Sequence, residues 1–199
     1  MVAGVDEVGR GAFAGPLVAA AVVFKSAKSM PVGLNDSKQL APSRRLEMAR
    51  RIIATADAIG FGQASSDSID ENGITWATQR VFAEAVLELG ASPDFILVDA
   101  YRVRDLIHIR QKAIVKGDQQ VAVIAAASIM AKVYRDYLMT TMYHLCFPRY
   151  NFKQHKGYGT QLHRELIIKF GPCSIHRKSF LTNLLPSINL AKIKYGLEI

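Results

Sequence analysis

The chain has 199 residues, 50% of them hydrophobic and 21% charged, and its 25 Lys and Arg against 17 Asp and Glu give a net charge of +8. This length suits one domain that buries about 70% of the surface of the unfolded chain. No apolar run reaches the length of about 20 residues that spans a bilayer, and no basic leader precedes the first apolar run, so we expect neither a membrane span nor a signal peptide. Cys146 and Cys173 lie in no metal-binding or redox motif, which favours two reduced thiols in a cytoplasmic protein.

The first half of the chain predicts three strands and two helices. Short apolar runs bounded by turn residues predict strands over 1–8, 16–24 and, more weakly, 58–66. Apolar residues at helical spacing, with cations between them, predict an amphipathic helix from Pro42 to about Ala56. A second helix is predicted over 74–90, where a glycine ends it.

The second half of the chain predicts two more strands, over 93–100 and 112–118. A long helix predicted over 119–146 is apolar nearly all round in its first half, so it should be buried against a sheet. A last helix is predicted over 160–170, where Gly171 and a proline stop it. Strands that lead, followed by helices interleaved with further strands, predict an α/β domain with helices layered on the sheet.

Most of the excess positive charge lies in a basic segment over 149–178, which contains seven Lys or Arg and one acid, Glu165. Aromatic residues and histidines are interspersed there, at Tyr150, Phe152, Tyr158, Phe170, His155, His163 and His176. Cations mixed with aromatic rings suit a polyanion that also offers flat rings or sugars. A solvated helix face with a few core aromatics is an alternative that composition leaves open.

Acidic residues stand at the ends of three predicted strands: Asp6 and Glu7 in "VAGVDE", Asp99 in "ILVDA" and Asp118 in "IVKGD". Asp118 has a structural alternative, because a side chain just before a long helix can cap its backbone amides with a gain of about 1 kcal/mol. If the three strand ends meet in the fold, four negative charges crowd into one place.

Carboxylates a few ångströms apart repel one another strongly unless protons or cations neutralise them. Oxygen ligands favour hard divalent cations such as Mg²⁺ or Mn²⁺. In a basic protein such a site indicates metal-assisted chemistry on a phosphodiester, in which two cations activate the attacking water and stabilise the leaving oxygen. Neighbouring residues of a regular strand point to opposite faces, so Asp6 and Glu7 can share the site only if the strand ends between them or bulges.

The glycines after these acids have the spacing Gly9-x-Gly11-x-x-x-Gly15. This spacing leads into a strand rather than a helix, so it does not fit a dinucleotide-binding loop. With Arg10 between the first two, the glycines instead suit a close approach of backbone amides to a sugar–phosphate chain.

Seven blocks of the sequence resemble the motifs of ribonuclease HII, the type 2 ribonuclease H family, and they occur in that family's order. The blocks are "GVDEVGRGAFAGPLVAAAV", "LNDSKQL", "ILVDA", "VKGD", "AAASIMAKVYRD", "HKGYGT…H" and "HRKSF". The resemblance implies an RNase H-like fold, a mixed central β-sheet flanked by helices, with a helical carboxy-terminal part. It also implies one catalytic domain over 1–199, with an α/β core over 1–146 and a basic helical part over 147–199 that contacts substrate.

The same resemblance implies an endoribonuclease that uses Mg²⁺ or Mn²⁺ to hydrolyse the RNA strand of RNA–DNA hybrids. It further implies nicking of duplex DNA on the 5′ side of an embedded ribonucleotide, which leaves a 3′-hydroxyl and a 5′-phosphate. These activities would serve ribonucleotide and RNA primer removal in DNA replication and repair. We expect a cytoplasmic monomer that binds no membrane and needs no obligate protein partner.

The motifs also imply roles for individual residues. The four metal-binding catalytic carboxylates match Asp6, Glu7, Asp99 and Asp118. The loop that grips the backbone at the RNA-to-DNA junction and senses the 2′-hydroxyl matches Gly9, Arg10 and Gly11. Tyr158 matches the tyrosine that stacks on the deoxyribose after the ribonucleotide, and Lys38 of "DSK" is expected to contact a phosphate or the active site.

Several positions keep more than one interpretation. Asp136 lies four residues after Lys132, so an ion pair is the simple interpretation and a direct metal role is the alternative. The three histidines of the basic segment fit support of the substrate surface, packing or capping. Gln119 and Gln120 depart from the family, which commonly has a lysine or serine there, and this removes a possible phosphate contact. The tail over 186–199 fits a small helix or a partner contact.

Two rival functions were weighed against the ribonuclease. A non-catalytic module that binds hybrids or duplexes would explain the basic segment, but a pure binder gains nothing from acids that repel phosphate. A DNA exonuclease or a transposase-like protein would share the acidic cluster, but would not require "GRG" together with "KGYGT". The complete set of motifs therefore favours the ribonuclease.

Overall fold

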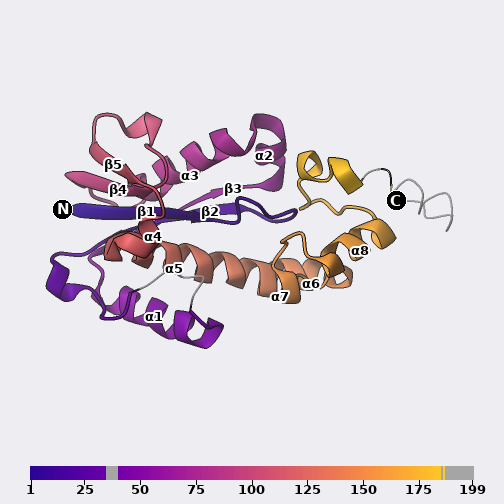
Figure 1. Cartoon of the computed structure of the whole chain (residues 1–199), viewed down its shortest axis with the longest axis horizontal. Coiled ribbons are helices and arrows are strands. Elements are labelled where there is room, and N and C mark those ends of the chain that lie inside the picture. Colours follow the sequence, from indigo (N-terminus) through magenta and orange to yellow (C-terminus); the bar gives the residue numbers. More distant parts are fainter. Residues whose placement is uncertain (35–39, 185, 187–199) are drawn as a thin grey trace.

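A mixed five-stranded sheet lies between two layers of helices in the computed structural model, which describes residues 1–34, 40–184 and 186 (Figure 1). The strands are β1 (Val2–Val8), β2 (Leu17–Val23), β3 (Ala58–Ala64), β4 (Phe95–Asp99) and β5 (Arg110–Ile114). They lie in the order β3-β2-β1-β4-β5. The pairings β3–β2 and β2–β1 are antiparallel, and β1–β4 and β4–β5 are parallel, as expected for the mixed sheet.

Helices cover both faces of this sheet. They are α1 (Pro42–Thr55), α2 (Ser66–Asn72), α3 (Ile74–Leu87), α4 (Gly117–Gln120), α5 (Ala122–Tyr137), α6 (Tyr143–Cys146), α7 (Phe152–His155) and α8 (Gln161–Phe170). Figure 1 shows α2 and α3 on one face, α5 with α1 outside it on the other, and α6 to α8 beyond one end of the sheet. None of the helices that the described residues form is long and apolar enough to cross a membrane.

The helix predicted to be buried, α5, supplies much of one hydrophobic core. Every residue of α5 from Val123 to Ala131 is buried, and it packs on β1 and on β2, whose seven residues are all buried. A side chain at Gly4 of β1 would lie 2.2 Å from the carbonyl oxygen of Val123, so only glycine permits this approach. The close contact brings the middle of α5 against the carboxyl half of β1.

The strand predicted over 112–118 is wrong at its end. β5 stops at Ile114, and Lys116 takes a left-handed backbone conformation with φ 54° that ends the extended chain and begins α4. Asp118 therefore lies in the first turn of a short helix rather than at a strand end. β4 does end at Asp99 as predicted, because Ala100 also has a positive φ, of 57°.

The single helix predicted over 119–146 consists of four pieces. Val121 has an extended backbone with φ −131°, which separates α4 from α5. A π-helical turn, Leu138–Met142, then joins α5 to α6. A further helix, α2, was not predicted from the sequence, and Gly73, at φ 84°, separates it from α3.

The carboxy-terminal part is joined to the loop between β1 and β2. Isolated β-bridges pair Ala12 with Tyr158 and Ala14 with His176. The predicted last helix, α8, begins after Thr160, whose hydroxyl accepts a hydrogen bond from the backbone of His163, and it ends at Gly171. The loop that carries Gly9, Arg10 and Gly11 therefore lies beside the segment that carries Tyr158. Residues 187–199, in the tail that fits a helix or a partner contact, lie outside the described residues.

Candidate active site

Three of the predicted carboxylates meet at the carboxyl ends of β1 and β4. Asp6, Glu7 and Asp99 each offer a ligand atom, and these atoms all lie within 4.8 Å of one another. The parallel register of the two strands pairs Val5 with Val98, so Asp6 and Asp99 are the next neighbours along the sheet. Asp6 is buried, with 4% of its surface exposed, whereas the other two side chains are half-buried.

Asp6 and Glu7 reach this site from opposite faces of β1. Asp6 hydrogen-bonds Ser128 of α5 on one face. Glu7 lies two residues after Val5 and so on the same face as Val5, which belongs to the core beneath α3. The expectation that the strand ends or bulges between them is wrong, because β1 pairs with β2 without interruption as far as Val8. The β1–β4 ladder, however, stops at Val5, so beyond it β1 has a free edge around which the longer Glu7 side chain can reach.

The electrostatics of the cluster favour a bound cation. Burial raises the pKa of Asp6 well above its ordinary value, and the nearby charges of Glu7 and Asp99 raise it further. Hydrogen bonds from Ser128 and from the Glu7 amide, at 2.7 Å, act in the opposite direction. Because the ligand atoms are carboxylate oxygens, the cluster fits a hard divalent cation, which would relieve the repulsion.

Asp118 lies close to this cluster but is not one of its members. In the part of the chain that the structure describes, the group of acids within 4.8 Å contains the other three carboxylates only. The backbone amide of Gly117 donates to Asp99 Oδ1 at 2.7 Å. Asp118 is buried and directly follows Gly117 in the chain, so it lies close to Asp99. Asp118 is not at the N-cap position of either helix, since Lys116 and Val121 occupy the N-cap positions of α4 and α5.

The glycine–arginine loop begins directly after these acids. Gly9 has φ +91°, and a side chain there would collide with Arg135, whereas Gly11 has no heavy atom within 4 Å of the position of a Cβ and is exposed. Arg10 donates to the hydroxyl of Tyr101 at 2.6 Å, and its guanidinium lies 4.9 Å from the centre of that ring. Because Tyr101 follows Asp99 by two residues, this contact holds Arg10 on the side of the carboxylate cluster.

Two buried arginines hold the loop in place, and the sequence analysis missed both. Arg135 donates to the carbonyl oxygens of Ala14, Pro16 and Lys156 at 2.8 to 3.0 Å. Arg177 donates twice to the carbonyl of Gly15, at 2.9 and 3.1 Å, and once to that of Arg10, at 3.0 Å. Neither has exposed surface, and burial lowers the pKa of Arg177 to about 9. Arg177 therefore supports the loop and does not belong to the cationic surface of the basic segment.

Tyr158 lies among cations, as its place in the basic segment suggests. Its half-buried ring has Lys132 Nζ at 5.3 Å and the Arg135 guanidinium at 5.1 Å from the ring centre. The β-bridge to Ala12 holds it against the glycine–arginine loop. Lys38, the remaining predicted contact, lies outside the described residues.

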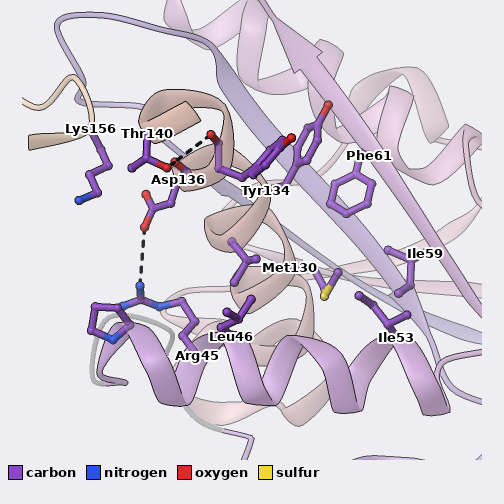
Figure 2. Close-up of a pocket in the computed structure, with 13 residues that line it drawn as sticks. Arg45, Leu46, Ile53, Ile59, Phe61, Met130, Tyr134, Asp136, Thr140 and Lys156 are labelled. Carbon is purple, nitrogen blue, oxygen red and sulfur yellow. Dashed lines mark hydrogen bonds and ion pairs between the residues drawn. The ribbon is translucent and has the colours of Figure 1, made fainter. Parts of the chain in front are cut away.

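Asp136 is an ion-pair residue. Its Oδ1 accepts from Lys132 at 2.7 Å, as the helical spacing predicts, and its Oδ2 lies 3.7 Å from Arg45 of α1. It stands at the polar end of a groove of about 620 Å³ between α1, β3 and α5, whose other end is lined by apolar residues such as Ile53 and Phe61 (Figure 2). Both oxygens face cations there, which does not fit the alternative of a direct metal ligand.

The histidines of the basic segment are not surface residues. His155, His163 and His176 have 6%, 0% and 1% of their surface exposed, and they pack against one another beneath Tyr158. Cys173 is a free thiol next to this cluster, and Cys146 is a free thiol on the surface. Packing, one of the three interpretations that the sequence left open, therefore holds for all three histidines.

Comparisons with known proteins agree on one family. The protein-family model described as Ribonuclease HII matches residues 3–183 of this chain. The "Ribonuclease HII" of Syntrophus aciditrophicus (strain SB) is 51% identical over 180 residues, which cover 90% of this chain and 84% of the relative. Among solved structures, RNase HII in a PCNA complex from Archaeoglobus fulgidus has a TM-score of 0.78 at 27% identity, covering 92% of this chain and 96% of that one. Ribonuclease H2 from Pyrococcus horikoshii OT3 has a TM-score of 0.76 at 25% identity, covering 96% and 98%.

Proposed function

Because the chain belongs to the ribonuclease HII family, and is therefore a metal-dependent hydrolase that acts on RNA–DNA hybrids, we propose that it also nicks duplex DNA on the 5′ side of an embedded ribonucleotide. The observation that carries this proposal is the position of the glycine–arginine loop. It follows the carboxylate cluster in the chain and is bridged to the segment of Tyr158. A site that cuts and a surface that can read a sugar–phosphate backbone thus adjoin each other.

For the chemistry we propose Asp6, Glu7, Asp99 and Asp118 as the ligands of the catalytic metal. Two divalent cations held by these residues, either Mg²⁺ or Mn²⁺, would activate the attacking water and stabilise the leaving oxygen. Cleavage would then leave a 3′-hydroxyl and a 5′-phosphate. The protein's part is to fix the carboxylates in advance, and Ser128 and the Gly117 amide do so by hydrogen-bonding Asp6 and Asp99. Asp118 is included in the ligand set because it directly follows Gly117, whose amide hydrogen-bonds Asp99.

For substrate recognition we propose that Gly9, Arg10 and Gly11 contact the backbone at the RNA-to-DNA junction. Gly11 is open to solvent, which supports a close approach of its amide to a phosphate. Tyr158 offers its ring to the deoxyribose after the ribonucleotide, and Lys38 is proposed as a phosphate contact. A dinucleotide with a 2′-hydroxyl on one side and none on the other would then be recognised as a junction.

In the cell these activities would serve ribonucleotide and RNA primer removal during DNA replication and repair. We propose that the protein is a cytoplasmic monomer and that cleavage needs no second protein. The relative from Archaeoglobus fulgidus was solved with PCNA, so partner binding occurs in at least one similar protein, and the monomer stays a prediction that light scattering can check. The purely binding module is set aside, since the family is one of enzymes.

The proposal is tested with duplex DNA that carries one ribonucleotide on a labelled strand. We expect one nick, 5′ to the ribonucleotide, in the presence of Mg²⁺ or Mn²⁺, and none when a chelator removes the metal. An all-DNA duplex is the control for contaminating nucleases. Cleavage of a long RNA–DNA hybrid without any nick at the single ribonucleotide would overturn the proposal and leave the family assignment intact.

Asp99→Asn tests the carboxylates. It preserves the size of the side chain and removes one charge from the cluster, so we expect a loss of cleavage of about 10³-fold or more, with duplex binding largely retained. Asp105→Asn, at an exposed acid in the turn between β4 and β5, serves as the matched control. Cleavage by Asp99→Asn at the rate of the unsubstituted protein would show that the site assignment is wrong.

A further inference from the structure

The three buried histidines form a hydrogen-bonded chain that ends on the backbone of Tyr158. His163 Nδ1 lies 3.0 Å from the carbonyl oxygen of Tyr158, and its Nε2 lies 3.1 Å from His176 Nε2. His176 Nδ1 in turn lies 2.9 Å from the backbone nitrogen of Cys173. His155 stacks on His163 with 4.0 Å between the ring centres.

The two backbone groups at the ends of this hydrogen-bonded series determine which ring nitrogen carries the hydrogen in His163 and in His176. The carbonyl of Tyr158 can only accept, so His163 Nδ1 carries the hydrogen and its Nε2 is an acceptor. His176 Nδ1 lies 2.9 Å from the amide nitrogen of Cys173, 3.1 Å from Cys173 Sγ and 3.3 Å from the Cys173 carbonyl oxygen. The amide is the nearest of the three and can only donate, so His176 Nδ1 is an acceptor and its Nε2 carries the hydrogen. Both assignments agree at the central contact, where His176 Nε2–H donates to His163 Nε2. The three hydrogen bonds to Tyr158, between the two rings and from Cys173 form together only when both rings are neutral.

The surroundings of the rings favour this neutral state. Burial lowers the pKa of His163 to about 3 and that of His176 to about 4, and it also lowers the pKa of His155, which Lys156 lowers further. Two other titratable groups beside the cluster are neutral near pH 7, since burial raises the pKa of Cys173 to about 11 and that of Tyr150 to about 12. An added proton on His163 Nε2 would face the hydrogen of His176 and break the chain.

The chain completes the backbone contacts of Tyr158. The Tyr158 amide donates to the carbonyl of His155 at 2.9 Å, and its carbonyl accepts from Thr160 at 2.8 Å as well as from His163. We infer that His163 and His176 are positioning residues, which fix Tyr158 at the height where its ring meets the sugar on the DNA side of the junction. This inference rests on the proposed role of Tyr158 and adds that the ring's selectivity depends on two residues that never contact substrate.

The proton positions can be measured without any substitution. Nitrogen-15 NMR of the imidazole side chains in the unsubstituted protein should show the Nδ1–H tautomer for His163 and the Nε2–H tautomer for His176. Neither ring should titrate near the ordinary pKa of 6.5. The opposite tautomer on either ring, or titration of His163 near pH 6.5, would overturn this relay of hydrogen bonds.

The selectivity is tested by two substitutions at His163. His163→Leu removes both contacts, and we expect it to lower kcat/KM for a single ribonucleotide by about tenfold relative to kcat/KM for a long hybrid. His163→Asn places an amide donor near the former Nδ1 position and should restore part of that ratio. His108→Asn, the same change at an exposed histidine, should leave the ratio unaltered. An unaltered ratio in His163→Leu would overturn the inference, and hybrid cleavage reports whether each variant is folded.

Tyr158→Ala separates this inference from the function on which it rests. If Tyr158→Ala and His163→Leu both lower the ratio, the inference is supported. If Tyr158→Ala lowers it and His163→Leu does not, the relay has no part in selectivity although the proposed function holds. If Tyr158→Ala has no effect, the proposed role of the tyrosine is wrong, and the selectivity part of the inference falls with it.

Discussion

Asp6 is the residue at which function and stability conflict most directly. It is buried beside two other acids, and its raised pKa reports the cost of holding a charge there without a cation. A site of this kind destabilises the metal-free protein and recovers stability when a cation binds. The charge is therefore present for catalysis and not for the fold.

Asp6→Asn should reverse this balance. The amide keeps a hydrogen-bonding group of the same size toward Ser128 and removes the repulsion, so we expect the metal-free variant to be more stable than the unsubstituted protein by about 1–2 kcal/mol. Denaturant unfolding with and without Mn²⁺ measures this. The unsubstituted protein should gain about 2.7 kcal/mol at a hundred times the Kd of the metal, and the variant much less.

Asp136→Asn is the matched control for that experiment. Its carboxylate pairs with Lys132 and Arg45, so the same change there should lower stability and leave the effect of the metal unchanged. If Asp6→Asn also lowers stability without metal, the repulsion inferred from the cluster is not the dominant effect at Asp6.

At the scale of single residues, the sequence predicted that three acids come together, but it did not predict that two arginines are buried. Asp6, Glu7 and Asp99 stand out because charges are rare at the ends of apolar strands. Arg135 gave a weaker signal, since it continues the buried helical face of Ala127 and Ala131 and could have been expected to point inward. Its partners are backbone carbonyls of a loop, and a sequence contains no record of where a loop's carbonyls point.

At the scale of elements, the contact between α5 and β1 determines the geometry of the site. It brings Ser128 to Asp6, and it exists because Gly4 has no side chain to hold the helix away. The site thus depends on a residue that touches none of its members.

Gly4→Ala should therefore disturb both fold and cleavage. The new methyl group would lie 2.2 Å from a backbone oxygen of α5, which cannot move aside like a flexible side chain, so we expect a loss of at least about 3 kcal/mol in unfolding free energy. Gly11→Ala is the control, because no heavy atom lies within 4 Å of the added group. Thermal unfolding compares the two, and equal small losses would show that the helix can shift at little cost.

Element prediction succeeded where the side-chain pattern alone decides and failed where backbone conformation decides. The burial of α5 follows from its apolar first half. The acid at 99 also predicts the end of β4, although the positive φ of Ala100 is what ends the strand. The early end of β5 depends on the left-handed Lys116, and the break before α5 depends on the extended Val121. Lysine does not favour the left-handed conformation, so tertiary contacts must impose it, whereas the extended conformation of Val121 is one that valine favours.

At the scale of the whole molecule, the net charge of +8 conceals cations of two kinds. Five of the seven in the basic segment are exposed, at Arg149, Lys153, Arg164, Lys169 and Lys178. Arg177, by contrast, is buried and serves the loop between β1 and β2. A polyanion would meet the exposed group, whereas the buried arginine contributes to the shape of the surface that it meets.

The buried histidines make the stability of the whole protein depend on pH. Their pKa values are lowered in the folded state, to about 3 for His163 and about 4 for His176, and return to 6.5 on unfolding. Below pH 6.5 the unfolded chain binds protons that the folded chain does not. The contribution of these histidines to the free energy of unfolding is therefore fully present above pH 6.5 and is lost as the pH falls toward 4.

We expect the free energy of unfolding to fall by up to about 1.4 kcal/mol per pH unit for each ring. Denaturant titrations between about pH 7 and pH 5 measure the slope, in an Asp6→Asn background that removes the opposing effect of the raised pKa of Asp6. His163→Asn in that background should flatten the slope. A slope unchanged by this substitution would mean that other groups carry the acid sensitivity.

The order of the strands leaves β3 and β5 with only one neighbour each, and exposed strand edges invite pairing with strands of other molecules. β5 carries the exposed cations Arg110 and Lys112, which would repel an identical strand brought alongside it. On β3 the amide of Gln63 already donates to Glu84 of α3 at 3.2 Å, so one outward donor is occupied. These features oppose edge-to-edge pairing at both borders of a sheet whose inner strand β2 is buried along its whole length.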